Sequence, residues 1–207
     1  MVCRYIGVEP RPGSYRGSEV LSYCQGPFRT TFAGGCICTI ARDGFHRAEA
    51  VHDIFMMGFS YDDPFILSFI TDQCSRSTKF RMTIVTNKEL LEQSQHVKEF
   101  FRTLSLHSRN LTCYAYQGES KRPTYKFAGK SDWIQRDYSA NMHAKSLRIG
   151  PILIAGSSNW TVSGAADYDV NAVTWLGPAA LREQHDRETD VIASCVPVAS
   201  VISFGAP

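Results

Sequence analysis

An α/β fold, with a mixed central sheet flanked by helices on both faces, is the fold class that this sequence predicts. Short apolar segments alternate along the chain with segments whose apolar residues recur at helical spacing, which is the order expected of sheet and helix layers. Apolar residues make up 43% of the chain and aromatic residues 12%, a composition typical of a globular protein and not of a disordered one. The 207 residues suffice for one domain with a full core.

The N-terminal part of the chain carries glycine and proline at irregular intervals and shows no sustained period. We expect residues 1–35 to form an irregular N-terminal extension or short edge structure, and residues 36–207 to form the domain. Within the domain, the apolar residues 36–40 predict a strand. Apolar side chains at helical spacing then predict a helix over 44–59, with Asp43 as its cap.

The middle of the chain predicts further strands around a long helix. Residues 65–70 form a short, continuous apolar run of the kind that a strand covered on both faces requires. Residues 80–85 predict another strand. Leucine, valine and phenylalanine then recur at helical spacing over 87–106, which predicts an amphipathic helix, and the β-prone residues 111–116 predict a strand.

The last third of the chain opens with two short extended segments. They precede and follow Gly150 and Pro151, a pair of residues typical of a turn, so the two segments are predicted to form a hairpin. The remaining predicted elements are a strand at 171–176, a helix at 179–194, and a final strand or covering tail at 196–204.

Side chains suited to chemistry are concentrated in residues 141–171. His143 and Lys145 stand two residues apart in an extended segment, so they project from the same face. Ser157 and Asn159 have the same spacing after the next segment. An ammonium, a hydroxyl and an amide can hold phosphate oxygens, and a neutral imidazole can attack phosphorus. These four residues therefore predict a phosphate site that needs no metal.

The same residues resemble a known signature. His143-x-Lys145 followed by Gly-Ser-Ser-Asn at 156–159 (Ser158 being the variable position) is similar to the H-x-K and G-S-x-N signature of the phospholipase D superfamily, which includes small single-motif phosphodiesterases and nucleases.

The resemblance implies the fold of that superfamily and a metal-independent phosphoryl transfer between two facing motifs. One histidine forms a phosphohistidine, and the other protonates the leaving oxygen. By this resemblance His143, Lys145 and Asn159 are catalytic, and Lys145, Ser157 and Asn159 bind the phosphate. Because this chain carries one complete motif, the resemblance also implies a homodimer.

Two positions depart from the pattern of the superfamily. The aspartate expected after the lysine is Gly150, and the glutamate that steadies the catalytic imidazole is Val170. Valine accepts no hydrogen bond. Asp167 and Asp169 are nearby carboxylates, but strand alternation turns Asp169 to the other face. The sequence therefore leaves two hypotheses open: an active phosphodiesterase, or a catalytically impaired module that keeps the anion pocket for binding or as a scaffold.

Residues 118–142 lead directly into His143 and mix cations with aromatic rings, as a surface that contacts phosphates and bases would. A solvated connection whose rings pack on the core would give the same pattern. We favour nucleic acid as the substrate and keep phospholipid as the alternative, because no lipid-docking surface is recognisable. With a net charge of only +2, affinity for nucleic acid must be local. The candidate substrate contacts are Lys126, Lys130, Trp133 and Arg136.

Other features receive structural interpretations. His96-x-Lys98 repeats the H-x-K spacing, but on the predicted helix residues two apart diverge by ~200°. Seven scattered cysteines, an odd number, predict reduced thiols and neither a disulfide framework nor a metal site. No cofactor is predicted.

The sequence gives no sign of a membrane or export signal. No leader is recognisable, and no apolar run reaches the ~20 residues of a membrane span, so we expect a soluble protein of the cytoplasm or another intracellular compartment. A piece of a larger protein, with its second motif supplied by another domain, is a further option.

Overall fold

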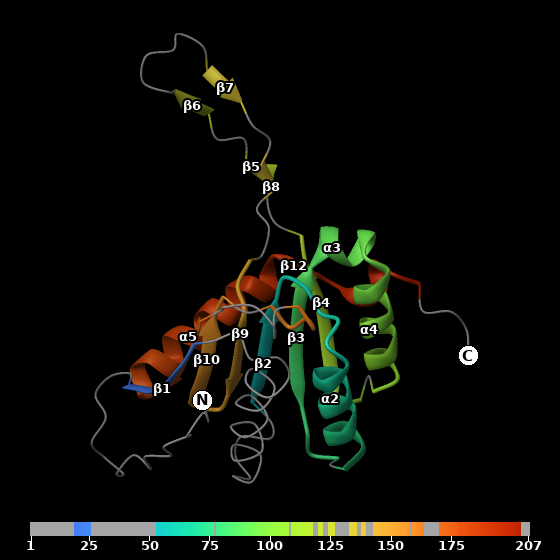
Figure 1. The fold of residues 1–207 in the computed structure, drawn as a ribbon, viewed down its shortest axis with the longest axis vertical. Helices are drawn as coiled ribbons and strands as arrows, with labels where there is room; N and C mark the ends of the chain where they lie inside the picture. The colour runs from blue at the N-terminus through green and yellow to red at the C-terminus, as the bar shows by residue number, and fades with distance from the viewer. Residues whose placement is uncertain are drawn as a thin grey trace.

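One large sheet lies at the centre of the structure, a computed structural model (Figure 1). The structure describes residues 19–25, 53–76, 78–107, 109–117, 120–121, 124–126, 133–135, 138–139, 143–157, 159–163 and 170–203. Across the sheet the strands are ordered β1 (Glu19–Gln25), β11 (Val170–Trp175), β10 (Ile152–Gly156), β9 (Ser146–Ile149), β2 (Ile54–Gly58), β3 (Met82–Asn87), β4 (Leu111–Tyr116) and β12 (Cys195–Pro197). Strands β2, β3 and β4 run parallel and the other neighbours antiparallel, which confirms the predicted mixed sheet.

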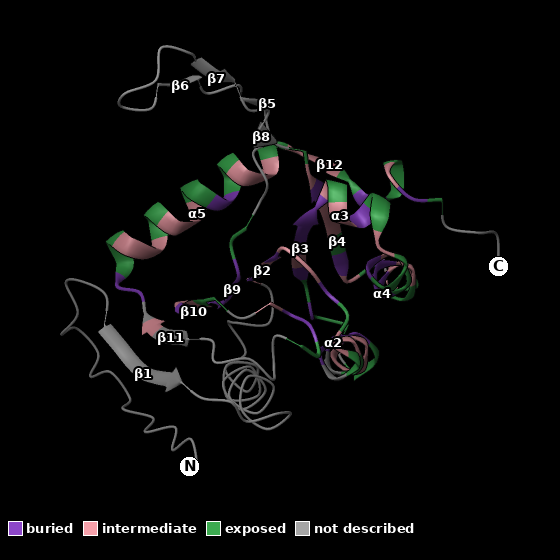
Figure 2. Ribbon diagram, turned by 45° about the horizontal axis from the view of Figure 1, so that its top comes forward, coloured by how far each residue is buried: buried purple, intermediate pink, exposed green. Residues whose placement is uncertain are grey.

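Helices cover both faces of the sheet. On one face lie α2 (Pro64–Arg76) and α4 (Gln95–Ser105), preceded by the short α3 (Lys88–Gln93). The long helix α5 (Pro178–Ala193) crosses the opposite face (Figure 2). The predicted helix over 87–106 is thus two helices, because Ser94 interrupts it. The Ser94 hydroxyl accepts a hydrogen bond from the Val97 N–H at 3.4 Å and so caps α4.

Two apolar clusters hold the layers together. The larger one lies between the sheet and the α2/α4 layer, where Phe100 and Leu104 of α4 pack with Ile84 of β3. The smaller one lies under α5 and is built on Phe55 and Val85. Each large apolar side chain that is fully buried contributes ~1.5–3 kcal/mol, so these clusters supply most of the stability of the sandwich.

Two predicted elements are wrong. The run at 65–70 is not a strand but part of α2, in which Ile66, Ile70 and Cys74 are buried at helical spacing. A short apolar run fits a buried helix as well as a buried strand, and Pro64 suits a helix start because the missing N–H is not needed there. The helix predicted over 44–59 is also wrong at its end.

Residues 54–58 of that predicted helix form strand β2. Both faces of β2 are covered, so its residues are buried without the alternation that marks a half-exposed strand. The earlier residues of the prediction, and the predicted strand over 36–40, lie outside the described residues.

The other predicted elements are confirmed. Strands β3, β4 and β11, the β9–β10 hairpin and helix α5 all lie where the sequence placed them. After β12 the chain forms a 3₁₀ turn, η2 (Val198–Ser200). Within residues 1–35, β1 is an edge strand paired with β11.

Residues 118–142 contain short strands that pair with one another outside the main sheet. They are β5 (Ser120–Lys121) with β8 (Tyr138–Ser139), and β6 (Thr124–Lys126) with β7 (Trp133–Gln135). No helix in the described parts of the chain has both the length and the apolar character needed to cross a membrane.

Candidate active site

The β9–β10 hairpin brings the two halves of the motif to one end of the sheet. Gly150 forms the turn with φ 53°, a left-handed conformation that favours glycine. At the other end of the hairpin, the Gly156 N–H donates a hydrogen bond to the Lys145 carbonyl at 3.2 Å. Lys145 enters β9 and Ser157 leaves β10, so Lys145 pairs with the residue that precedes Ser157.

His143 and Lys145 are in direct contact. The Lys145 ammonium lies 3.1 Å from Nδ1 of His143 and donates to the His143 carbonyl at 2.8 Å. Lys145 is only 6% exposed, whereas His143 is exposed. Because an ammonium has no acceptor, Nδ1 must accept this hydrogen bond, and the proton of the neutral ring is then assigned to Nε2.

Phe59, the residue after β2, lies beside both His143 and Lys145. Its ring centroid lies 5.3 Å from that of His143, and the Lys145 ammonium lies 5.8 Å from the same centroid. An aromatic face at this distance attracts a cation and restricts the neighbouring ring. Sequence reasoning missed this residue because it treated Phe59 as the last apolar position of a helix, and no local signal pointed to the site.

Trp160 fixes the second half of the motif against the end of β2. Its indole N–H donates to the Met57 carbonyl at 2.6 Å. A Cβ atom at Gly58 would overlap the Trp160 indole and lie 2.7 Å from Cζ of Tyr61, so only glycine fits there. Since Phe59 contacts His143, and Trp160 directly follows Asn159, both halves of the motif are anchored at the same corner.

Tyr61 continues this anchor. Its hydroxyl donates to the Val85 carbonyl at 2.9 Å inside the core. Burial raises the pKa of Tyr61 well above its ordinary value, and the nearby Cys113 thiol adds to the shift, so the phenol stays protonated and remains a donor. The Asp62 N–H also donates to the Trp160 carbonyl at 3.1 Å, which ties the chain after β2 to the chain after β10.

The side chain of Asn159 has a polar atom whose hydrogen-bonding capacity is not satisfied by the described residues. Its Oδ1 is buried and has no hydrogen-bond partner among the described residues. A half-turn of the amide would put the NH₂ group in that position and offer two donors to an anion. Thr86, which pairs with Gly58 at the same end of the sheet, likewise has a buried hydroxyl without a partner in the described part of the chain. A buried polar group left unpaired costs about 1–3 kcal/mol, so a ligand that paired it would be stabilised.

The remaining residues of the site hypothesis are only partly described. Ser157 is exposed beside Gly156. Val170 begins β11, and Lys126 and Trp133 lie in β6 and β7. The structure does not describe the side chains of these last three residues. Ser158, Lys130, Arg136, Asp167 and Asp169 lie outside the described residues.

A second buried cation, Arg148 of β9, belongs to a different cluster. Its guanidinium donates to both carboxylate oxygens of Glu188 on α5, at 2.8 and 2.6 Å, and lies 2.8 Å from Oδ1 of Asp53. Burial alone would lower the pKa of Arg148, but hydrogen bonds to Glu188 and Asp53 raise it above its ordinary value. Arg148 therefore stays charged and fastens α5 to the sheet.

The structure also describes the second H-x-K segment and three of the cysteines, which the sequence did not assign to the site. His96 is exposed on helix α4, as expected for a coincidental H-x-K. Cys74, Cys113 and Cys195 are free thiols, and burial raises the pKa of Cys74 to about 11. No group of three His, Cys, Asp or Glu side chains gathers at metal-binding distance within the described ranges.

Comparison with known proteins identifies the fold. No protein-family model matches the sequence, and no curated protein sequence matches it either. NucT from Helicobacter pylori superimposes with a TM-score of 0.58 at 16% identity, over 85% of this chain and 99% of NucT. Nuc from Salmonella typhimurium, a phospholipase D family member, gives a TM-score of 0.60 at 15% identity, over 87% of this chain and 97% of Nuc.

A larger protein shares the fold as well. The phosphatidylserine synthase of Haemophilus influenzae gives a TM-score of 0.51 at 10% identity, over 86% of this chain and 40% of the synthase. These matches agree with the order of strands and helices that the resemblance implied. The chain therefore has the phospholipase D-like fold.

Proposed function

We propose that this chain is a metal-independent phosphodiesterase that cleaves nucleic acid. The observation that carries the proposal is the contact between a buried ammonium, Lys145 Nζ, and an exposed imidazole, His143, at 3.1 Å. A fixed cation beside the ring can stabilise the charge of a phosphate that the ring attacks. The fold shared with a phospholipase D family member supports phosphodiester chemistry.

In the proposed reaction, Nε2 of His143 attacks phosphorus, and the bond from phosphorus to the leaving oxygen breaks. The leaving oxygen takes a proton from the corresponding histidine of a second copy of the chain. Water then attacks phosphorus, the P–N bond breaks, and that second histidine takes the proton of the water. Imidazole suits both tasks because it gains and loses a proton near neutral pH. The charge at phosphorus is held by Lys145, Ser157 and Asn159, so the reaction uses no metal.

The hydrogen bond from Lys145 to Nδ1 determines which nitrogen of the neutral His143 ring carries the proton. While Lys145 donates to Nδ1, the proton of the neutral ring sits on Nε2, so neither ring nitrogen offers a free lone pair to phosphorus. To act as the nucleophile, the ring must shift its proton and expose a lone pair on Nε2. An ammonium has three N–H groups, so a bound phosphate can draw Lys145 toward itself and release Nδ1 for that shift.

A homodimer is part of the proposal because one chain carries one complete motif. Two copies with facing His143 rings would supply one nucleophile and one acid. Sedimentation should show a dimer, and the specific activity should fall on dilution below the dissociation constant. A monomer that keeps full specific activity on dilution would contradict this part.

The decisive experiment is cleavage of labelled single-stranded and double-stranded nucleic acid in the presence of EDTA. His143→Ala should lower kcat by at least about 10³-fold, because both chemical steps require the imidazole. His96→Ala is the matched control, since His96 has the same H-x-K context on an exposed helix face and should change nothing. Vesicles of phosphatidylcholine, offered in parallel, test the phospholipid alternative. Cleavage that survives His143→Ala would overturn the proposal.

A second candidate function is an anion-binding module without catalysis. It is favoured by one specific observation: the contact of His143 Nδ1 is with a donor, Lys145, while the position expected to supply an accepting glutamate is Val170. This candidate predicts that the dimer binds an oligonucleotide and leaves it intact at every pH tested. It also predicts that an alkaline quench yields no phosphohistidine by mass spectrometry, whereas the enzyme would yield one.

A further inference from the structure

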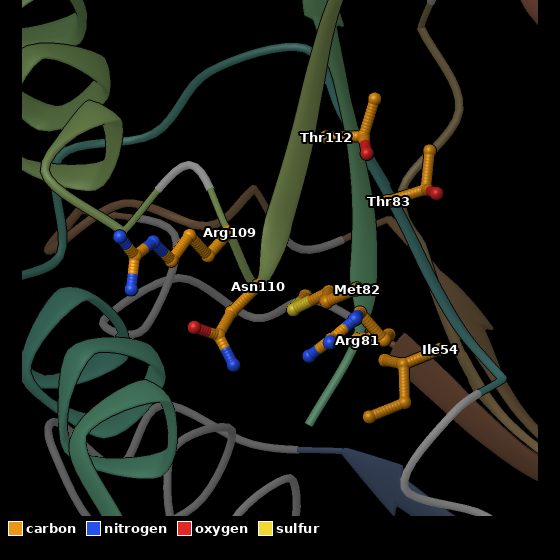
Figure 3. Close-up of a pocket in the computed structure, with 7 residues that line it drawn as sticks. All are labelled: Ile54, Arg81, Met82, Thr83, Arg109, Asn110 and Thr112. Carbon is orange, nitrogen blue, oxygen red and sulfur yellow. The ribbon is translucent and has the colours of Figure 1, made fainter. Parts of the chain in front are cut away.

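A polar pocket lies at the opposite end of the parallel strands from His143. It has a volume of ~100 Å³ and opens beside the starts of β2, β3 and β4 (Figure 3). Ile54 and Met82 form its buried apolar side. The rest of its lining can donate hydrogen bonds: Arg81, Thr83, Arg109, Asn110 and Thr112.

The two arginines are not neutralised by the described parts of the chain. None of the ion pairs between described residues involves Arg81 or Arg109, although surface arginines elsewhere, such as Arg102 with Glu99, are paired. Both side chains are exposed. Two guanidinium groups at one small pocket attract an anion, and their fork geometry suits phosphate.

The pocket is preorganised on its arginine and amide side. Arg81 donates to the Thr78 carbonyl at 2.9 Å and to the Phe80 carbonyl at 2.6 Å. The Asn110 amide donates to the same Phe80 carbonyl at 3.0 Å. These hydrogen bonds fix two donor groups side by side, so an anion that bound there would lose little conformational entropy in ordering them.

The sheet surface at the pocket is open. Thr83 and Thr112 are directly paired neighbours in β3 and β4, on the face that also carries Phe55. Phe55 is buried in the cluster under α5, whereas Thr112 is exposed and Thr83 half-buried. The helix therefore leaves this end of the face uncovered, and two hydroxyl groups complete the ring of donors.

We infer that the pocket of Arg81, Arg109 and Asn110 is a second phosphate-binding site, which holds a backbone phosphate of the nucleic acid away from the scissile one. The inference rests on the proposed function. Strand β2 separates the pocket, at Ile54, from the catalytic corner, at Gly58, and spans ~13 Å at 3.3 Å per residue. With a rise of ~3.4 Å per nucleotide, the two sites are at least about four nucleotides apart on a stacked strand, because β2 is buried and the nucleic acid must pass over the surface.

The test compares oligonucleotides that are too short to reach the pocket with ones that are long enough. Binding of labelled single strands of about two and about twelve nucleotides would be measured by fluorescence anisotropy, with EDTA and with the catalytic residues unchanged, at several salt concentrations. A phosphorothioate backbone would prevent turnover. The variants are Arg109→Ala and Arg109→Glu, with Arg102→Ala on helix α4 as the matched control.

Arg109→Ala should weaken binding of the long strand about tenfold, lower its salt slope by about one, and leave binding of the short strand unchanged. Arg109→Glu should weaken binding of the long strand further. Equal affinity of the wild-type chain and both Arg109 variants for the long strand would overturn the inference. So would Arg109-dependent binding of inorganic phosphate, measured by calorimetry, if oligonucleotide affinity did not depend on Arg109, because the site would then serve a free phosphate compound.

Failure of the inference and failure of the proposed function give different results. If the chain binds the long strand through Arg109 but cleaves nothing, the pocket stands and the hydrolytic proposal fails. If the chain cleaves and loses activity with His143→Ala, while Arg109 has no effect on binding or on the dependence of KM on length, the pocket is refuted and the hydrolase stands.

Discussion

Lys145 and Arg148, three residues apart at the start of and within β9, are two buried cations with opposite surroundings. Lys145 is 6% exposed and Arg148 2%. Strand alternation sends them to opposite faces of the sheet. Arg148 meets the carboxylates of Glu188 and Asp53, whereas the described contacts of Lys145 are with the ring and carbonyl of His143 and the ring of Phe59.

We propose that this difference separates a structural cation, Arg148, from a catalytic one, Lys145. Moving a charge out of water costs several kcal/mol, and two carboxylates offset that cost for Arg148. The charge of Arg148 therefore has a structural role, because its ion pairs fasten α5 to the sheet. Lys145 is instead held against the imidazole that we propose as the nucleophile, at an end of the sheet where a buried oxygen of Asn159 has no partner among the described residues.

The largest expected effect is on the Arg148 cluster. Glu188→Ala should lower the free energy of unfolding by about 3–5 kcal/mol, because it leaves a buried guanidinium without its main partner. Urea unfolding followed by circular dichroism measures this change. Glu183→Ala, which breaks the exposed pair with Arg187, is the matched control and should cost at most about 1 kcal/mol.

The Arg148 prediction is sharpened by replacing both partners. The double variant Arg148→Met, Glu188→Leu should recover most of the lost stability, since apolar side chains of similar volume avoid the desolvation cost. A Glu188→Ala variant as stable as the wild type would mean that this cluster is not structural and would remove one side of the comparison.

The next effect concerns Lys145. Lys145→Met should lower kcat/KM for phosphodiester cleavage by about 10²–10³-fold, because the cation beside the phosphate is lost. The free energy of unfolding should fall by less than in Glu188→Ala, since methionine fills the space of the lysine side chain and Lys145 is not the main partner of a buried carboxylate in the described contacts. Steady-state kinetics and urea unfolding, with Lys98→Met as control, separate the two quantities. A loss of stability with normal kinetics would make Lys145 a structural residue like Arg148.

A smaller effect is expected from a conservative change at Arg148. Arg148→Lys keeps the charge but lacks the planar fork that matches both oxygens of Glu188, so we expect a loss of about 1–2 kcal/mol in unfolding free energy. Catalysis at low temperature should be normal. If Arg148→Lys lowered the free energy of unfolding as much as Glu188→Ala does, the geometry of the two hydrogen bonds to Glu188 would contribute more than the pairing of opposite charges.

The smallest effect is at Phe59, a positioning residue that acts through His143 and Lys145. Phe59→Leu should lower kcat about two- to fivefold, corresponding to the ~0.5–1 kcal/mol of a ring–cation contact, while KM stays the same. Phe59→Tyr keeps the ring and should restore kcat. Equal kcat in all three proteins would show that the ring contacts are incidental.

Local patterns predicted the parts of the fold whose residues carry their own signals. Gly150 and Pro151 mark a turn in any context, and the hairpin around them aligned Lys145 with Gly156, the residue before Ser157. Ser157 and Asn159 could be proposed from residue type and spacing alone. The helical identity of α2 could not, because the apolar run at 65–70 fits a strand or a helix until its partner layers are known.

Contacts between residues far apart in the chain could not be predicted from the sequence. Arg148 and Glu188 are forty residues apart, and nothing near Glu188 distinguishes it from the exposed charges of α5. Phe59 enters the site only because β2 ends beside β9, a pairing that depends on the order of strands in the sheet. The pocket at Arg81 and Arg109 also could not be predicted, because it forms where the starts of three strands meet and so depends on the strand order.

The fit of Trp160 against Gly58 gives the molecule an intrinsic optical reporter. An indole that is 3% exposed and hydrogen-bonded through its N–H emits in an apolar setting, and loosening of the corner that holds the motif would shift that emission toward longer wavelengths. With Trp133 and Trp175 replaced by phenylalanine, the fluorescence of a single side chain would follow ligand arrival and local opening at the motif, without any attached dye.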